Sequence, residues 1–194
     1  MPVLSDHKHS ALALILGWRK GERTMRRTPS LAGALLLAAW ALYITVVTAS
    51  NLTDLFSSFG WEHWAFRSGN LAYITKATSI YFHNLHANQA LLALVILWEG
   101  ASATLLWLAA LRWARAGQAA LAGARRGLVL LGLLWFGFAI STEFFIAYDR
   151  GVNESAYWTL ATAILATLIT LEIWGRSQPP AGRHAHGPAG HGST

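Results

Sequence analysis

The 194-residue sequence contains no cysteine, and only 12% of its residues are charged. Without cysteine, disulfides, thiolate metal sites and thiol catalysis are excluded. Soluble domains usually carry about twice this charged fraction. The sequence also lacks a Ser-His-Asp pattern, a phosphate-binding loop and a dinucleotide-binding fingerprint. These absences argue against a soluble enzyme, and we expect no catalytic activity and no catalytic residues.

Long apolar runs are what the sequence does contain, since 54% of its residues are hydrophobic. The four runs are residues 31–49, 90–111, 128–146 and 156–173. Each has about 18–22 residues, which at a helical rise of about 1.5 Å covers the roughly 30 Å hydrocarbon core of a bilayer. We therefore predict an all-α fold, a four-helix transmembrane bundle formed by residues 28–176. A basic N-terminal segment (1–27) precedes it, and a disordered His/Gly/Pro-rich tail (177–194) follows it.

The basic residues are sorted by connection. Twelve of the fifteen Lys and Arg residues lie before the first run, between the second and third, or after the fourth. The other two connections hold only Arg67, Lys76 and Arg150. This asymmetry predicts that both termini are cytoplasmic. Because the net charge of +6 is not gathered into one patch, we expect membrane lipid as a partner and no nucleic acid. The excess of arginine over lysine in an Ala/Leu/Gly-rich background indicates a GC-rich bacterial genome. We expect a multi-pass protein of the bacterial inner membrane.

Two acidic residues interrupt the apolar runs. Glu99 lies in "VILWEGASATLLW" (95–107), roughly 14 Å from Ala90 along a helix and so near the bilayer midplane. Ser102 shares its helix face. Glu143 lies near the outer end of the third run, which crosses in the opposite direction. We expect both acids to point into one interhelical seam in the middle and outer half of the membrane.

Three segments resemble a known family. They are "NLTD" (51–54), "LWEGASATLLWLAALRW" (97–113) and "WFGFAISTEFFIAYDRGVNESAYW" (135–158). They are similar to a domain-of-unknown-function family of predicted small bacterial integral membrane proteins with four transmembrane helices, over about residues 30–173. The resemblance implies the four-span topology, singles out Trp98, Glu99 and Glu143, and implies no activity. In the family, two glycines tend to precede the acid of the third span, where this sequence has serine and threonine.

Small residues recur at helical spacing on two of the runs. In the first run they are Ala34, Ala38, Ala41, Thr45 and Thr48, and in the fourth run they are Thr159, Ala163, Ala166 and Thr170. Such stripes allow helix backbones to approach closely in lipid. We expect the helices to pack against one another through these stripes.

Histidine is the usual ligand for a haem buried in a helical bundle, and none lies within the four runs. His83 and His86 would lie one turn apart on a helix, and with His63, Asp54 or Glu62 they could hold a metal at the outer surface. Histidines at an interface are more often simple polar residues, so we predict no metal and no cofactor.

Glu99 and Glu143 leave three roles open. The first is structural, with the acid hydrogen-bonded to Ser102, Thr45 or a neighbouring tryptophan. The second is a proton or cation pathway, and the third is docking against a partner. We predict a non-catalytic accessory or structural component of a membrane assembly, in a larger complex or in self-association. The alternative is a small oligomeric ion- or proton-coupled carrier that uses Glu99 and Glu143.

Overall fold

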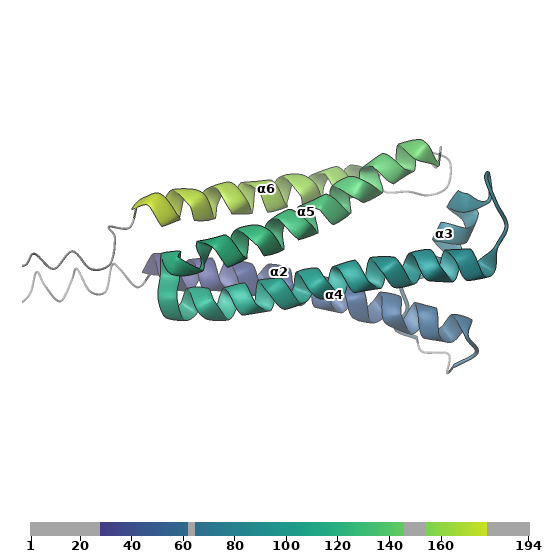
Figure 1. Cartoon of the computed structure of the whole chain (residues 1–194), viewed down its shortest axis with the longest axis horizontal. Helices are drawn as coiled ribbons and strands as arrows, with labels where there is room; N and C mark the ends of the chain where they lie inside the picture. The colour runs from purple at the N-terminus through teal and green to yellow at the C-terminus, as the bar shows by residue number, and fades with distance from the viewer. Residues whose placement is uncertain (1–27, 62–64, 146–153, 178–194) are drawn as a thin grey trace, which may run out of the picture.

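The computed structural model describes residues 28–61, 65–145 and 154–177 (Figure 1). Within these ranges the chain is helical and has no strand, which confirms the all-α prediction. The helices are α2 (Thr28–Ser58), α3 (Asn70–Thr78), α4 (Leu85–Ala116), α5 (Leu121–Phe144) and α6 (Glu154–Ser177), with a short 3-10 helix, η1 (Gly117–Ala120), between α4 and α5. The basic segment predicted for residues 1–27 and the tail predicted beyond Ser177 lie outside the described residues.

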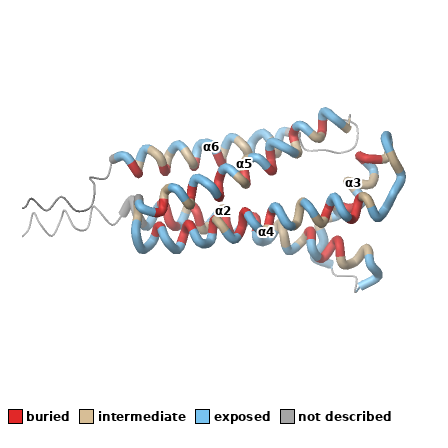
Figure 2. The backbone as a smooth tube through the Cα atoms, in the orientation of Figure 1, coloured by how far each residue is buried: buried red, intermediate tan, exposed pale blue. Residues whose placement is uncertain are grey.

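Helices α2, α4, α5 and α6 are long and apolar enough to cross a membrane. Each buries only one face, and exposed positions alternate with buried ones along its length (Figure 2). The exposed positions include large apolar side chains such as Leu35, Leu97, Leu133 and Ile173. In lipid such a surface carries no hydrophobic penalty, because lipid tails are as apolar as leucine. The prediction of a four-helix transmembrane bundle is confirmed.

The four long helices form two antiparallel hairpins, α2 with α4 and α5 with α6. The hairpins are joined along α4 and α5, and α2 makes little contact with α6. The start of α2, the η1 turn and the end of α6 lie together, and we call this the η1 end (Figure 1). Helix α3 lies at the opposite end, which we call the α3 end.

The core at the η1 end is apolar and closely packed. Leu37, Leu106 and Leu128 have no exposed surface, and Trp113 is 1% exposed. A Cβ atom added to Gly33 of α2 would lie only 2.3 Å from Nε1 of Trp113 on α4. The glycine therefore lets the tryptophan ring lie directly against the backbone of α2, and the two helices approach closely.

The hairpins diverge toward the α3 end. Helices α5 and α6 bend away from α2 and α4, and α3 lies in the opening between them (Figure 1). The sequence predicts one outer connection between the first and second apolar runs, over residues 50–89. The described part of this connection is largely helical: α2 continues to Ser58, α3 follows, and α4 begins at Leu85. Apolar composition indicates the part of a helix that lies in hydrocarbon, whereas helical hydrogen bonding continues beyond it.

The small-residue stripes have different outcomes on the two helices. On α2 the expectation is met in part: Ala34 and Ala41 are buried, Ala38 and Thr48 are half-buried, and Thr45 is exposed. On α6 the expectation is wrong, because Thr159 and Ala166 are exposed. The buried face of α6 instead carries Ile164, Thr167 and Leu171.

Candidate functional site

Glu99 lies near the middle of α4 and is only 1% exposed. Its partner is Asn51 of α2, which is also 1% exposed. The side-chain Nδ2 of Asn51 donates to both carboxyl oxygens of Glu99, at 2.8 and 2.9 Å. A buried acid needs such partners, because an unpaired one would lose its hydration without compensation. The expected partners Ser102 and Thr45 bond elsewhere, so the pairing with Asn51 is a finding of the structure.

The network continues from Asn51 to the start of α3. Nδ2 of Asn70 donates to Oδ1 of Asn51 at 2.7 Å. Both ends of the Asn51 amide are therefore used, one on Glu99 and the other on Asn70. This chain of three side chains joins α4, α2 and α3, and we call it the Glu99 network.

Asp54 of α2 fixes the start of α3 beside this network. Gly69 precedes α3 with a positive φ of 73° and makes no side-chain cap hydrogen bond. The missing cap is supplied from α2, since Oδ2 of Asp54 accepts from the backbone N–H of Leu71 at 2.8 Å. It also accepts from the hydroxyl of Ser68, at 3.3 Å. A carboxyl group at a helix N-terminus satisfies a free N–H and complements the helix dipole.

The segment "NLTD" (51–54) thus lies in α2, and three of its four residues bond to other parts of the chain. Asn51 and Asp54 bond as described, and the hydroxyl of Thr53 donates to the carbonyl of Phe66. None of these contacts could be predicted from the sequence. The signal that could have indicated them is three polar side chains within four residues, directly after an apolar run.

Further polar pairs hold the α3 end together. Asn88, with no exposed surface, accepts from the hydroxyl of Thr78 at 2.9 Å. Nε2 of Gln89 donates to the hydroxyl of Ser58 at 3.0 Å, and Nδ1 of His86 lies 3.0 Å from Oε1 of Gln89. His86 is therefore paired with an amide. Among the described residues, no group of three or more His, Asp or Glu side chains is placed to hold a metal.

The other sequence-predicted site residues lie apart from one another. Nε1 of Trp98 donates to the carbonyl of Leu130 at 2.9 Å and so links α4 to α5. Ser102 is buried, and its hydroxyl donates to the carbonyl of Trp98 in its own helix at 2.9 Å. Glu143 is exposed, so the expectation that it shares a seam with Glu99 is wrong. Its neighbour Thr142 is the buried residue at this level, because one helical step turns a side chain by about 100°.

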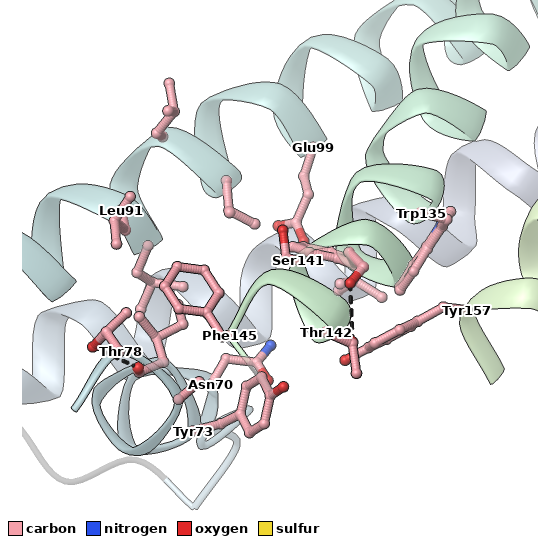
Figure 3. Close-up of a pocket in the computed structure, with 17 residues that line it drawn as sticks. Asn70, Tyr73, Thr78, Leu91, Glu99, Trp135, Ser141, Thr142, Phe145 and Tyr157 are labelled. Carbon is pink, nitrogen blue, oxygen red and sulfur yellow. Dashed lines mark hydrogen bonds between the residues drawn. The ribbon is translucent and has the colours of Figure 1, made fainter. Parts of the chain in front are cut away.

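A cavity of about 340 Å³ lies where the hairpins diverge (Figure 3). Glu99 points into it from α4, Ser141 and Thr142 line it from α5, and Tyr157 lines it from α6. Residues of α3, Asn70 among them, line the side toward the α3 end. The remaining lining is mostly apolar. In the described ranges no Lys or Arg lines this cavity.

Three aromatic rings form one wall of the cavity. Trp135 lies 5.6 Å from Phe138 and 5.9 Å from Tyr157 between ring centroids, and Phe138 lies 5.7 Å from Tyr157. We call these three residues the aromatic cluster. Nε1 of Trp135 is buried and has no hydrogen-bond partner within the described part of the chain. An unpaired buried donor is unfavourable, and a polar atom in the cavity would relieve it if it came within reach.

Polar contacts become sparse between Glu99 and the η1 end. Beyond Ser102, the buried residues of α4 are Ala103, Leu106, Ala109, Ala110 and Trp113. The side-chain hydrogen bonds that join helices in this half come mainly from tryptophans. Nε1 of Trp107 donates to Thr45 at 3.1 Å, and Nε1 of Trp40 donates to Thr167 at 3.0 Å. The Glu99 network and the cavity are thus confined to the half of the bundle toward α3.

The fold and these contacts define the class: an α-helical multi-pass membrane protein with a buried polar network and an internal cavity on one side of the bundle. The comparisons add no relative, since no family model, no curated protein and no solved structure matches the chain.

Proposed function

We propose that the protein is a non-catalytic accessory or structural component of an assembly in a bacterial inner membrane. The observation that carries this proposal is the Glu99 network. A catalytic acid is typically placed against a reacting group or a second titratable residue. Glu99 instead has both oxygens bonded to one amide, which is itself oriented by Asn70. Such a network fixes the register of α2, α3 and α4 relative to one another. Helices held in this way would form a rigid surface to which a partner protein can bind.

The partner experiment compares the wild type with two variants at one position. Each is purified from native membranes in mild detergent, and the retained proteins are identified by mass spectrometry. We expect the wild type and Glu99→Gln to retain the same proteins, since glutamine keeps the size and most of the hydrogen bonding. Glu99→Leu loses the contact with Asn51 and should retain less. If Glu99→Gln loses the partner as fully as Glu99→Leu while the fold is intact, the structural role of Glu99 is wrong.

The carrier alternative receives less support from the geometry. Moving an ion through one chain requires polar groups in both halves of the membrane. The buried face of α4 toward the η1 end is apolar, and Glu143 does not line the cavity. A carrier would therefore need its pathway between copies of the chain. Proton flux into liposomes from a purified homo-oligomer, abolished by Glu99→Gln, would favour the carrier over the accessory role.

For the orientation, we propose that the η1 end is cytoplasmic. Of the described basic residues, Arg112, Arg115, Arg125, Arg126 and Arg176 belong to the helix ends at the η1 end. Reporter fusions within η1 and after α6 should then read cytoplasmic, and a fusion between α3 and α4 should read external. A cytoplasmic reading between α3 and α4 would contradict this orientation.

We also propose that the chain is a divergent member of the four-span family that its second and third spans resemble. The support is the arrangement of four long helices and the placement of Trp98 and Glu99 at contacts between helices. The "NLTD" segment, which resembles part of the same family, supplies the partner of Glu99. Because Asn51 and Glu99 bond to each other, we expect family members that have both residues to have the same arrangement of helices at the α3 end.

A further inference from the structure

The carboxyl group of Glu99 borders a cavity that contains no matching positive charge. In the described ranges none of its lining residues is Lys or Arg. One amide nitrogen serves both carboxyl oxygens, whereas a carboxylate can accept about four hydrogen bonds. The group therefore keeps acceptor capacity toward the cavity. A bound cation would complete the pairing that buried charges require.

The walls around this acid suit an organic cation. The three residues of the aromatic cluster line the cavity, and aromatic rings attract cations most strongly where water is excluded. The rest of the lining is largely aliphatic, with residues such as Val95 and Leu92. The cavity volume of about 340 Å³ falls in the usual range for a small-molecule site. An acid, aromatic faces and apolar walls together match a positively charged nitrogen that carries hydrocarbon substituents.

The cavity is bordered by lipid-facing residues of α4. Leu91 and Leu94 line it and are also 38% and 59% exposed. This wall therefore continues into the surface that α4 presents to lipid. A ligand that reaches Glu99 by this side comes from the membrane and is itself lipophilic.

We propose that the cavity binds a lipophilic organic cation, with its ammonium group at Glu99 and against the aromatic cluster and its hydrocarbon part along α4. The same chemistry can come from a free amphiphilic amine or from the headgroup of an aminophospholipid. This binding site goes beyond the accessory role and does not depend on it.

The direct test is binding of radiolabelled hexyltrimethylammonium to the full chain in a nonionic detergent, measured by equilibrium dialysis. We expect saturable binding of one cation per chain. The neutral carbon isostere, 2,2-dimethyloctane, has the same shape without the charge and should compete poorly. Absence of saturable binding, or equal competition by the neutral isostere, would overturn the proposal.

Three variants locate the site. Glu99→Gln should weaken binding by about tenfold or more, because it removes the charge that pairs with the cation. Glu143→Gln is the matched control: it removes the same charge from a residue outside the cavity and should bind as the wild type does. Ser141→Phe fills the cavity from α5 while leaving Glu99 and Asn51 in place, and should abolish binding. Wild-type affinity in either the Glu99→Gln or the Ser141→Phe variant, with its helical content unchanged, would refute the site.

The source of the ligand is resolved by adding phospholipid. If phosphatidylethanolamine displaces the labelled cation and co-purifies with the wild type but not with Glu99→Gln, the natural ligand is a lipid headgroup. If it does not displace the cation, phosphatidylethanolamine is excluded as the ligand and the proposed source is a free amphiphilic amine. Both results support the proposed chemistry.

Discussion

Replacing Asn51 by leucine removes the amide that faces Glu99. Two contacts to the carboxyl group, at 2.8 and 2.9 Å, are lost together with the 2.7 Å contact from Asn70. Interhelical hydrogen bonds in membranes contribute about 0.6 kcal/mol on average and up to about 1.7 kcal/mol. Leaving a buried polar group unsatisfied adds about 1–3 kcal/mol. We therefore expect Asn51→Leu to lower the free energy of unfolding by about 2–5 kcal/mol, since it removes these contacts and leaves the buried Glu99 carboxyl group unsatisfied, whereas Asn70 is only half-buried.

Glu99→Leu should cost less, about 1–2 kcal/mol, because leucine is buried readily and only the Asn51 amide loses a partner. In the double variant both sides of the contact are apolar. Its cost should therefore fall short of the sum of the single costs by about 1–2 kcal/mol, which is the coupling energy of the pair.

The assay is reversible unfolding of the full chain in mixed micelles of increasing SDS content, followed by far-UV circular dichroism. Ser102 supplies the control cycle, since it is buried on the same helix but bonds to the carbonyl of Trp98. Coupling between Ser102 and Glu99 should be close to zero. If the Asn51 and Glu99 costs add fully, or if Ser102 couples to Glu99 as strongly as Asn51 does, the Glu99 network is wrong.

Two further predictions concern packing and charge. Gly33→Ala should destabilise the bundle by about 1–3 kcal/mol in thermal denaturation, because the new methyl group would overlap the Trp113 ring. Adding Trp113→Phe to this variant should recover part of the loss. The control is Gly137→Ala, which should show no loss, because no atom lies within 4 Å of the added Cβ. A loss at Gly137 equal to that at Gly33 would point to general helix effects. Arg125→Gln removes the 2.5 Å ion pair with Glu172. Because the Arg125 side chain is 56% exposed and that of Glu172 is 22% exposed, the variant should lower the free energy of unfolding by less than about 1 kcal/mol. The cost should fall further in high salt, and a large, salt-independent cost would show that the pair is not solvent-screened.

The four crossing helices could be predicted from the sequence because a bilayer imposes a length on apolar segments. That constraint applies to each helix alone and needs no knowledge of its neighbours. The same constraint does not indicate where a helix ends outside the hydrocarbon. Asn51 and Asp54 follow the apolar run and resemble the start of a loop, yet α2 continues through them to Ser58. Their polar groups are satisfied by α3 and α4, which composition does not reveal.

The partner of Glu99 depends on helix rotation and could not be predicted in this way. A buried acid in the middle of a span was expected, and its burial is a feature of the structure. Which neighbour meets it depends on how α2 and α4 rotate against each other. The same reason applies to Glu143. Adjacent residues of a helix point in different directions, and the rotation of α5 buries Thr142 and exposes Glu143. In a membrane protein, apolar residues occur both at positions that face lipid and at positions that face the protein interior. The sequence pattern therefore gives little information on which face of a helix is buried.

The division into hairpins has a consequence for the order in which the chain is assembled during synthesis. Asn51, Asn70 and Glu99 all belong to α2, α3 and α4, so their contacts need no residue beyond Ala116. The first hairpin can therefore settle into its final register while α5 and α6 are still being made, as folding from the N-terminus allows. The cavity, in contrast, needs walls from both hairpins and is completed only when the second hairpin arrives. The polar network can thus form before the cavity does.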